Sequence, residues 1–230
     1  MTARTLAIGV LSLAVVPLGL HGQGPAQYRN FELGSDLAAV CDRAGIAASE
    51  AKTIHQRPAV LQELEWRPAR WIGGSTAVST DPVEQVLFSF YNDQLFRIVV
   101  DYNNERTEGM TENDMIEALS AVYGTPIKRT AGASHVSSRV EIESGSPLAR
   151  WGDAQYAVVL YRTSSYRASF RMIVTAAALD DLARKSTVQA ARLDEQEAPQ
   201  REIARQKKEQ DDGRAVAEKA RTANKAAFRP

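Results

Sequence analysis

Apolar and polar residues alternate along two neighbouring runs of the chain, 86–91 and 95–102. Successive side chains of a strand point to opposite faces, so this alternation predicts two strands that each have one apolar face. The runs are joined by Asn92-Asp93-Gln94, residues that tolerate turn geometry, and together they predict a β-hairpin. The residues expected on its core face are Val86, Phe88, Phe90, Phe96, Ile98 and Val100.

Apolar residues spaced three and four apart predict helices on both sides of this hairpin. The first covers 31–45, with Ser35 as its cap and Gly45 at its end. Another begins at Thr111, where Asp114 completes a variant of the capping box. A short helix is expected at 49–55, and further strands at 61–67, 139–143, 148–151, 156–162 and 169–175. The predicted fold class is α+β, an antiparallel sheet with helices on one face.

A five-residue sequence occurs twice, as Phe-Arg-Ile-Val-Val at 96–100 and as Phe-Arg-Met-Ile-Val at 170–174. Each copy follows a strand that ends in a tyrosine, and a tryptophan marks the strand before that one. The matching order of elements predicts a duplicated helix-strand-strand-strand unit. The predicted organisation is a signal peptide at 1–26, a first α+β unit at 27–110, a second at 111–177 and a charged helical tail at 178–230.

The first unit resembles a known family in the spacing of its apolar residues. The pattern is Phe31-x-Leu33-Gly34-x-x-Leu37-x-x-Val40, then Trp66, then Val86-Leu87-Phe88-Ser89-Phe90 and Leu95-x-x-Ile98. It resembles the small α+β domain of the barrel-assembly outer-membrane lipoproteins, and a tandem pair of such units is similar to the β-lactamase inhibitory protein. The resemblance covers roughly 31–175 and implies that the sheet or its loops meet protein partners. The chain lacks the lipid-acceptor cysteine of the lipoprotein branch.

The first 26 residues have the pattern of an export signal. Arg4 precedes an uncharged apolar stretch, 5–20, and small residues follow at Gly22, Gly24 and Ala26. Cleavage is expected after Ala26 or after Gly22. The apolar stretch is shorter than the roughly 20 residues that span a bilayer. We therefore predict a periplasmic or secreted protein that has no membrane span after cleavage.

The tail is rich in alanine and in charged pairs four residues apart, a pattern that favours helix. We expect residues 178–198 to be helix docked by Leu179, Leu182 and Leu193. Residues 199–230 are expected to form a solvated, mostly helical extension, interrupted at Pro199 and Gly213.

Composition narrows the classes of function. The chain has 28 basic and 28 acidic residues, so it lacks the basic excess typical of nucleic-acid binding, and no nucleic-acid partner is predicted. Cys41 is the only cysteine, which excludes an internal disulfide, and its place in an apolar stripe predicts a buried side chain.

Catalytic and metal-binding patterns are sparse. His55 and His135 stand far apart in the sequence, and the carboxylate pairs Glu63/Glu65 and Glu141/Glu143 are also typical of solvated strand faces. The run 101–112 places oxygen-bearing residues at calcium-loop spacing, but Arg106 occupies the position where that loop needs glycine. We predict no cofactor and no metal. The alternative is a cell-envelope hydrolase with a scattered acid/histidine site.

The second face of the sheet is the predicted binding surface. Tyr91 and Arg97 lie there in the first unit, and Tyr161 and Arg171 in the second. Tyrosine and arginine beside apolar residues are enriched at protein interfaces. The other possibilities are that these side chains only cover the sheet, or that the charged C-terminal helix lies on it. We expect a non-catalytic exported protein that binds another protein or an envelope component through this face.

Overall fold

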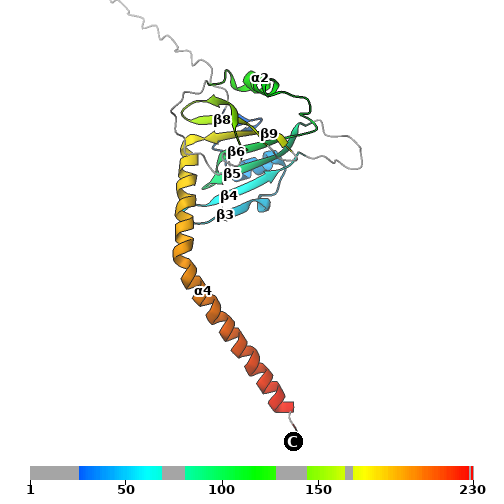
Figure 1. Cartoon of the computed structure of the whole chain (residues 1–230). Helices are drawn as coiled ribbons and strands as arrows, with labels where there is room; N and C mark the ends of the chain where they lie inside the picture. The colour runs from blue at the N-terminus through cyan, green and yellow to red at the C-terminus, as the bar shows by residue number, and fades with distance from the viewer. Residues whose placement is uncertain (1–25, 69–80, 128–143, 164–167, 228, 230) are drawn as a thin grey trace, which may run out of the picture.

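A seven-stranded antiparallel sheet forms the body of the molecule, with strand order β3-β4-β5-β6-β9-β8-β7 (Figure 1). The computed structural model describes residues 26–68, 81–127, 144–163, 168–227 and 229. The predicted α+β class is therefore confirmed. The predicted signal peptide and the predicted strand at 139–143 lie outside the described residues, apart from Ala26, which packs against the core.

The elements follow the chain in a simple order. The strands are β1 (Gln27–Tyr28), β2 (Phe31–Glu32), β3 (Lys52–His55), β4 (Leu61–Trp66), β5 (Val83–Tyr91), β6 (Gln94–Asn103), β7 (Pro147–Gly152), β8 (Tyr156–Arg162) and β9 (Ala168–Ala176). The helices are α1 (Leu37–Ala44), a 3-10 turn η1 (Ala48–Glu50), α2 (Glu112–Tyr123) and α4 (Ala177–Ala227).

The predicted hairpin is β5–β6, and a bulge changes the orientation of one of its residues. Asn92 and Asp93 make the turn with positive φ values of 45° and 67°. Phe90 pairs with Leu95, whereas Ser89 pairs with Arg97, so Phe96 is an extra residue in β6. The prediction that Phe96 faces the core is wrong for this reason: Leu95 takes the core position, and Phe96 packs on the opposite face.

Helices α1 and α2 cover the core face of the sheet. Val40 and Cys41 of α1, and Met115 and Leu119 of α2, are buried in the same cluster as the apolar side chains of β5, β6, β8 and β9. Trp151 of β7 is completely buried there. Such burial removes apolar area from water at about 25 cal/mol per Å², and this face is the main hydrophobic core.

The predicted start of α2 is correct, and the predicted start of α1 is a few residues too early. Thr111 and Asp114 form the capping box. Helix α1 begins later than predicted because β2 occupies the start of that run, and its N-cap is Asp36, whose side chain accepts a hydrogen bond from Ala39 N at 2.7 Å. The expected helix at 49–55 is wrong: most of that run is strand β3, which pairs with β4.

The two predicted units share one sheet, because β6 pairs directly with β9. Their registers match across this junction. Trp66 pairs with Val86 and Val86 with Val100, while Trp151 pairs with Val158 and Val158 with Val174. Val99 and Ile173, which occupy the same place in the two five-residue sequences, pair with each other. The strand pairing of β4, β5 and β6 therefore corresponds to that of β7, β8 and β9 on the two sides of this pair.

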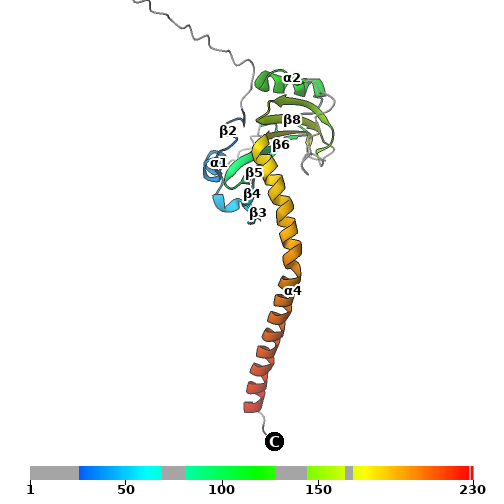
Figure 2. The ribbon, with the colours of Figure 1, turned by 90° about the vertical axis from the view of Figure 1, so that its left-hand side faces the viewer.

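Helix α4 follows β9 without a loop, crosses the strands from β9 past β3 and continues well beyond the sheet (Figure 1). Seen from the side, it lies in front of the sheet, away from α1 and β2 (Figure 2). It bends partway along its length, and Pro199 lies inside it. Proline removes a helix hydrogen bond and clashes with the preceding turn, which explains a bend. The predicted interruptions at Pro199 and Gly213 are wrong, because one helix continues through both residues.

Candidate functional site: a groove between α4 and the sheet

An ion pair holds the first turn of α4 to the sheet. Asp180 accepts a hydrogen bond from Nη2 of Arg97, which stands in the middle of β6. Arg97 is 8 % exposed and Asp180 is 9 % exposed, so both charges are largely removed from water. Arg184, one turn further along α4, places its Nε 3.3 Å from Asp180 Oδ2. A buried charge is tolerated only when it is paired, so this contact favours the position of the first turn of α4 against the sheet.

A second ion pair holds α4 where it reaches the edge of the sheet. Arg57, in the β3–β4 connection, donates two hydrogen bonds to the carboxylate of Glu197, at 2.9 Å and 2.7 Å. This guanidinium holds the pKa of Glu197 below its usual range. The two attachment points, Asp180 and Glu197, are separated by about 25 Å along the helix axis.

Small residues let α4 lie close to the sheet at its beginning. Ala183, Ser186 and Ala190 are buried, and Ala183 contacts the cluster of Leu61 and Phe96. Leu179 packs against the same cluster. The prediction that Leu182 docks the helix is wrong, because its side chain is 45 % exposed. Leu193, the third residue of this prediction, lines the groove between α4 and the sheet.

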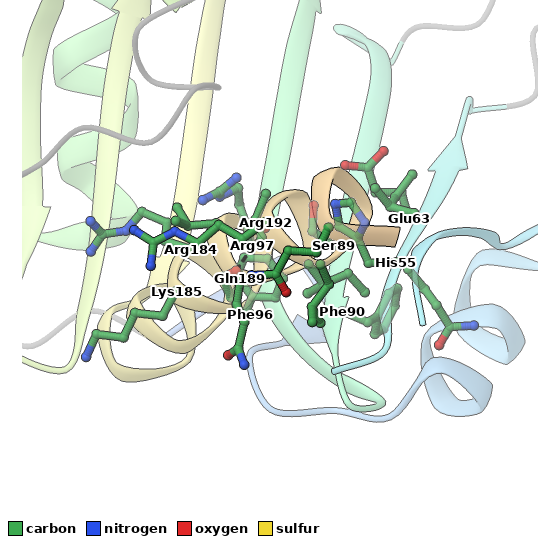
Figure 3. Close-up of a pocket in the computed structure, with 18 residues that line it drawn as sticks. His55, Glu63, Ser89, Phe90, Phe96, Arg97, Arg184, Lys185, Gln189 and Arg192 are labelled. Atoms are coloured by element: carbon green, nitrogen blue, oxygen red, sulfur yellow. Dashed lines mark hydrogen bonds between the residues drawn. The ribbon is translucent and has the colours of Figure 1, made fainter. Parts of the chain in front are cut away.

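Beyond this close contact the helix and the sheet separate and leave an open groove of about 1110 Å³. Its sheet side comes from β3, β4, β5 and β6, and its other side from α4. Figure 3 shows His55 and Glu63 on the strand side and Arg184, Lys185 and Arg192 on the helix side. The apolar lining residues are Ile54, Leu61, Phe90, Phe96, Ala183, Val188 and Leu193.

Two of these apolar side chains are open to solvent. Ile54 is 40 % exposed and Val188 is 54 % exposed, although each faces a groove with an apolar floor. Exposed apolar side chains grouped in a concave site are typical of binding surfaces.

Charge in the groove is unbalanced toward cations. Arg97, Arg184, Lys185 and Arg192 line it, with Glu63 as the single carboxylate of the lining. Arg97 and Arg184 are engaged with Asp180. Among the described residues, no ion pair involves Lys185 or Arg192. The groove therefore combines an apolar floor with two available positive charges.

The four residues predicted as a binding surface do not form one exposed patch. Arg97 is buried under the start of α4, and Tyr161 is buried beside Val159 and Ile173. Arg171 donates to Asp101, with Nε–Oδ1 at 2.6 Å, and Tyr91 packs half-buried near Phe96. The helix that the sequence left as an alternative occupant of this face lies on part of it, and of the four only Arg97 lines the groove.

The structure brings together one pair from the predicted hydrolase set. His55 and Glu63 line the same groove from adjacent strands. No hydrogen bond joins them in the described part of the chain. Glu65 instead accepts from Arg67 at 2.6 Å. His135, Glu141 and Glu143 lie outside the described residues.

The side chains at calcium-loop spacing in 101–112 make other contacts in the structure. Asp101, the first expected ligand, faces Arg171 within the sheet. The side chain of Asn103 accepts hydrogen bonds from the backbone of Glu105 and Arg106. Among the described residues, no three His, Cys, Asp or Glu side chains are grouped to hold a metal ion.

Sequence reasoning missed both attachment points of α4. Each joins residues that are far apart in the chain, Arg97 with Asp180 and Arg57 with Glu197. The available signal was the spacing of Ala183, Ser186 and Ala190, three and four residues apart on one helix face. Small residues in such a row indicate close packing of the helix.

No family model, curated protein or solved structure matches the chain in the three comparisons made with known proteins. Across the described residues, no helix combines the length and the apolar character that crossing a membrane requires.

Proposed function

We propose that this is a non-catalytic exported protein that binds another protein, and that its binding site is the groove between α4 and strands β3–β6. The observation that carries the proposal is the exposure of Ile54 and Val188 inside a groove floored by Leu61 and Phe96. A closed core would bury such side chains. If a partner buries Ile54 and Val188 when it binds, the removal of these side chains from water contributes favourable free energy to the complex.

Three further proposals accompany this one. The pattern of the first 26 residues supports export to the periplasm or beyond the cell. The matched registers of the two halves of the sheet support an origin by duplication. The resemblance to the barrel-assembly lipoprotein domain and to the β-lactamase inhibitory protein supports a protein as the partner.

Site-directed photo-crosslinking tests the location of the site. Val188 lies in the groove, and Val216 is 70 % exposed on the part of α4 that leaves the sheet, so the two form a matched pair of exposed valines. A photo-reactive amino acid at position 188 should give a discrete adduct in envelope extract, and the same group at position 216 should not. The adduct should disappear when excess unlabelled protein is added. Adducts only at position 216 would exclude the groove as the site.

The second candidate function is hydrolysis of a cell-envelope component, favoured by the presence of His55 and Glu63 in one groove. A histidine and a carboxylate can act as general base and acid when both reach the substrate. Substrate profiling of the wild-type protein with His55→Ala and Glu63→Gln variants separates the two functions. Turnover that either variant abolishes without lowering Tm would replace the binding proposal.

A further inference from the structure

We infer that the groove recognises an extended, acidic segment of the partner protein. This inference rests on the proposed function of the groove and adds the chemistry of what it binds. The carboxylates of the segment would contact Lys185 and Arg192, and its apolar side chains would cover Ile54 and Val188.

The charges of the groove select an anionic partner. Lys185 and Arg192 are both exposed along the helix side, where no ion pair of the described chain engages them. Glu63 is the only lining carboxylate, and Lys52 is its register partner on β3. A basic segment would bring like charges together, while an acidic one meets cations along the whole helix side.

The separation of the two cations fits an extended chain. They are seven residues apart on α4, which places them about 10 Å apart along the helix axis. In a polyproline II segment, residues three apart lie on the same side and about 9 Å apart. Carboxylates at positions i and i+3 of such a segment therefore match Lys185 and Arg192.

The length of the groove favours a polypeptide over a small molecule. The part of α4 that lines the groove, from Ala183 to Gln196, covers about 20 Å along the helix axis, the length of roughly six residues of polyproline II. The groove is open along this span, whereas small-molecule sites enclose most of their ligand.

Arg97 supplies a second, independent observation at the inner end of the groove. Its Nη2 donates to Asp180, but its Nε–H is buried with no acceptor among the described residues. A buried donor without an acceptor destabilises the folded state. Ser89 stands directly across the strand pair from Arg97 and lines the same groove. An oxygen of the partner could accept from this buried Nε–H only after the packing around Arg97 opens at this end of the groove.

The test uses the full chain and a labelled peptide of eight residues. The peptide carries Glu at positions 3 and 6 and Leu, Val and Pro elsewhere, and matched peptides carry Gln or Lys at the two Glu positions. Fluorescence anisotropy should show the Glu peptide binding about ten-fold more tightly than the Gln peptide, with the Lys peptide weakest. The Lys185→Gln/Arg192→Gln variant should lose about ten-fold in affinity for the Glu peptide alone.

The control variant is Lys207→Gln/Lys208→Gln, which makes the same change in net charge on the exposed part of α4. It should leave binding of the Glu peptide unchanged. Equal affinity for the Glu and Gln peptides, or an equal loss in the control variant, would overturn the inference. If that happens while the crosslink at position 188 persists, the groove remains the proposed site and only the acidic chemistry of the partner is wrong.

Discussion

The two faces of the sheet are closed in different ways. The core face is covered by α1 and α2, and its central side chains, such as Phe88 and Trp151, are completely buried. The other face holds α4 through the buried ion pair Arg97–Asp180 and the apolar cluster of Leu61, Phe96 and Ala183, and the solvent-exposed pair Arg57–Glu197 joins the helix to the edge of the sheet. The packed apolar side chains of the core face leave no space between the helices and the sheet. On the other face a groove remains between α4 and the sheet. The difference separates a closely packed face from a face that carries an open groove.

The largest loss of stability is expected from Phe88→Ala on the core face. Removing a buried phenylalanine leaves a cavity and costs about 4 kcal/mol, which urea unfolding measures directly. Leu87→Ala is the matched control, because Leu87 neighbours Phe88 but lies half-buried on the other face. Equal losses of unfolding free energy in the two variants would show that the two faces of the sheet contribute equally to stability.

Asp180→Ala should cost somewhat less, about 3 kcal/mol, because it leaves Arg97 buried without its partner. Thermal unfolding should show a fall in Tm of roughly 6–12 °C. The control is Asp181→Ala, whose exposed carboxylate contacts Arg184, and it should cost less than about 1 kcal/mol. If both variants unfold at the same temperature, the ion pair does not hold α4 on the sheet.

Alkaline pH should weaken the core face through its buried tyrosines. Burial raises the pKa of Tyr28 from its ordinary value of 10.0 to about 12, and burial also raises the pKa of Tyr102 and Tyr123. The unfolded chain then loses these protons before the folded one does. The stability that these groups contribute is complete below pH 10 and is lost as the pH rises toward 12.

The measurement is the free energy of unfolding between pH 9 and pH 12, followed together with tyrosinate absorbance. Tyr28→Phe should reduce the slope of this decline, because one group that binds its proton more tightly in the folded state is gone. If the free energy of unfolding of the variant falls with pH as steeply as that of the wild-type protein, Tyr28 does not contribute to the decline.

The smallest effect is expected from removing the end of α4. Every described residue from Pro199 onward is exposed, and the ion pairs there, such as Arg205–Glu209, lie on the helix surface. Truncation after Ala198 should shift Tm by no more than about 2 °C, because exposed segments contribute little. Trypsin should remove the same segment from the intact protein first. A fall of ten degrees would mean that this part of α4 packs on the body.

Local signals predicted much of the core face, and long-range contacts account for what the sequence did not reveal. Alternation located β5 and β6, and the capping box located α2, because each signal lies within a few residues. Phe96 was placed on the wrong face because strict alternation assumes that no extra residue interrupts a strand. Residues 49–55 became mostly strand because pairing with β4 outweighed their weak helix preference.

The groove could not be predicted from the same signals. Arg97 was recognised as a residue of the second face, but nothing near it in the sequence indicates Asp180 as its partner. Arg57 and Glu197 likewise come from distant segments. An ion pair across such a separation has no periodic pattern, so the sequence predicted the helix and the sheet but not the space between them.

The part of α4 beyond Pro199 is a continuous helix that extends away from the sheet (Figure 1). From Pro199 to Ala227 it extends about 42 Å as a helix, whereas a flexible chain of that length would average roughly 29 Å with a broad spread. Ion pairs such as Arg205–Glu202 support its helical form. A group attached at the C-terminal end would therefore be held at a nearly constant distance from the groove, and pulling on that end would transmit force along the helix to the contact between Arg97 and Asp180.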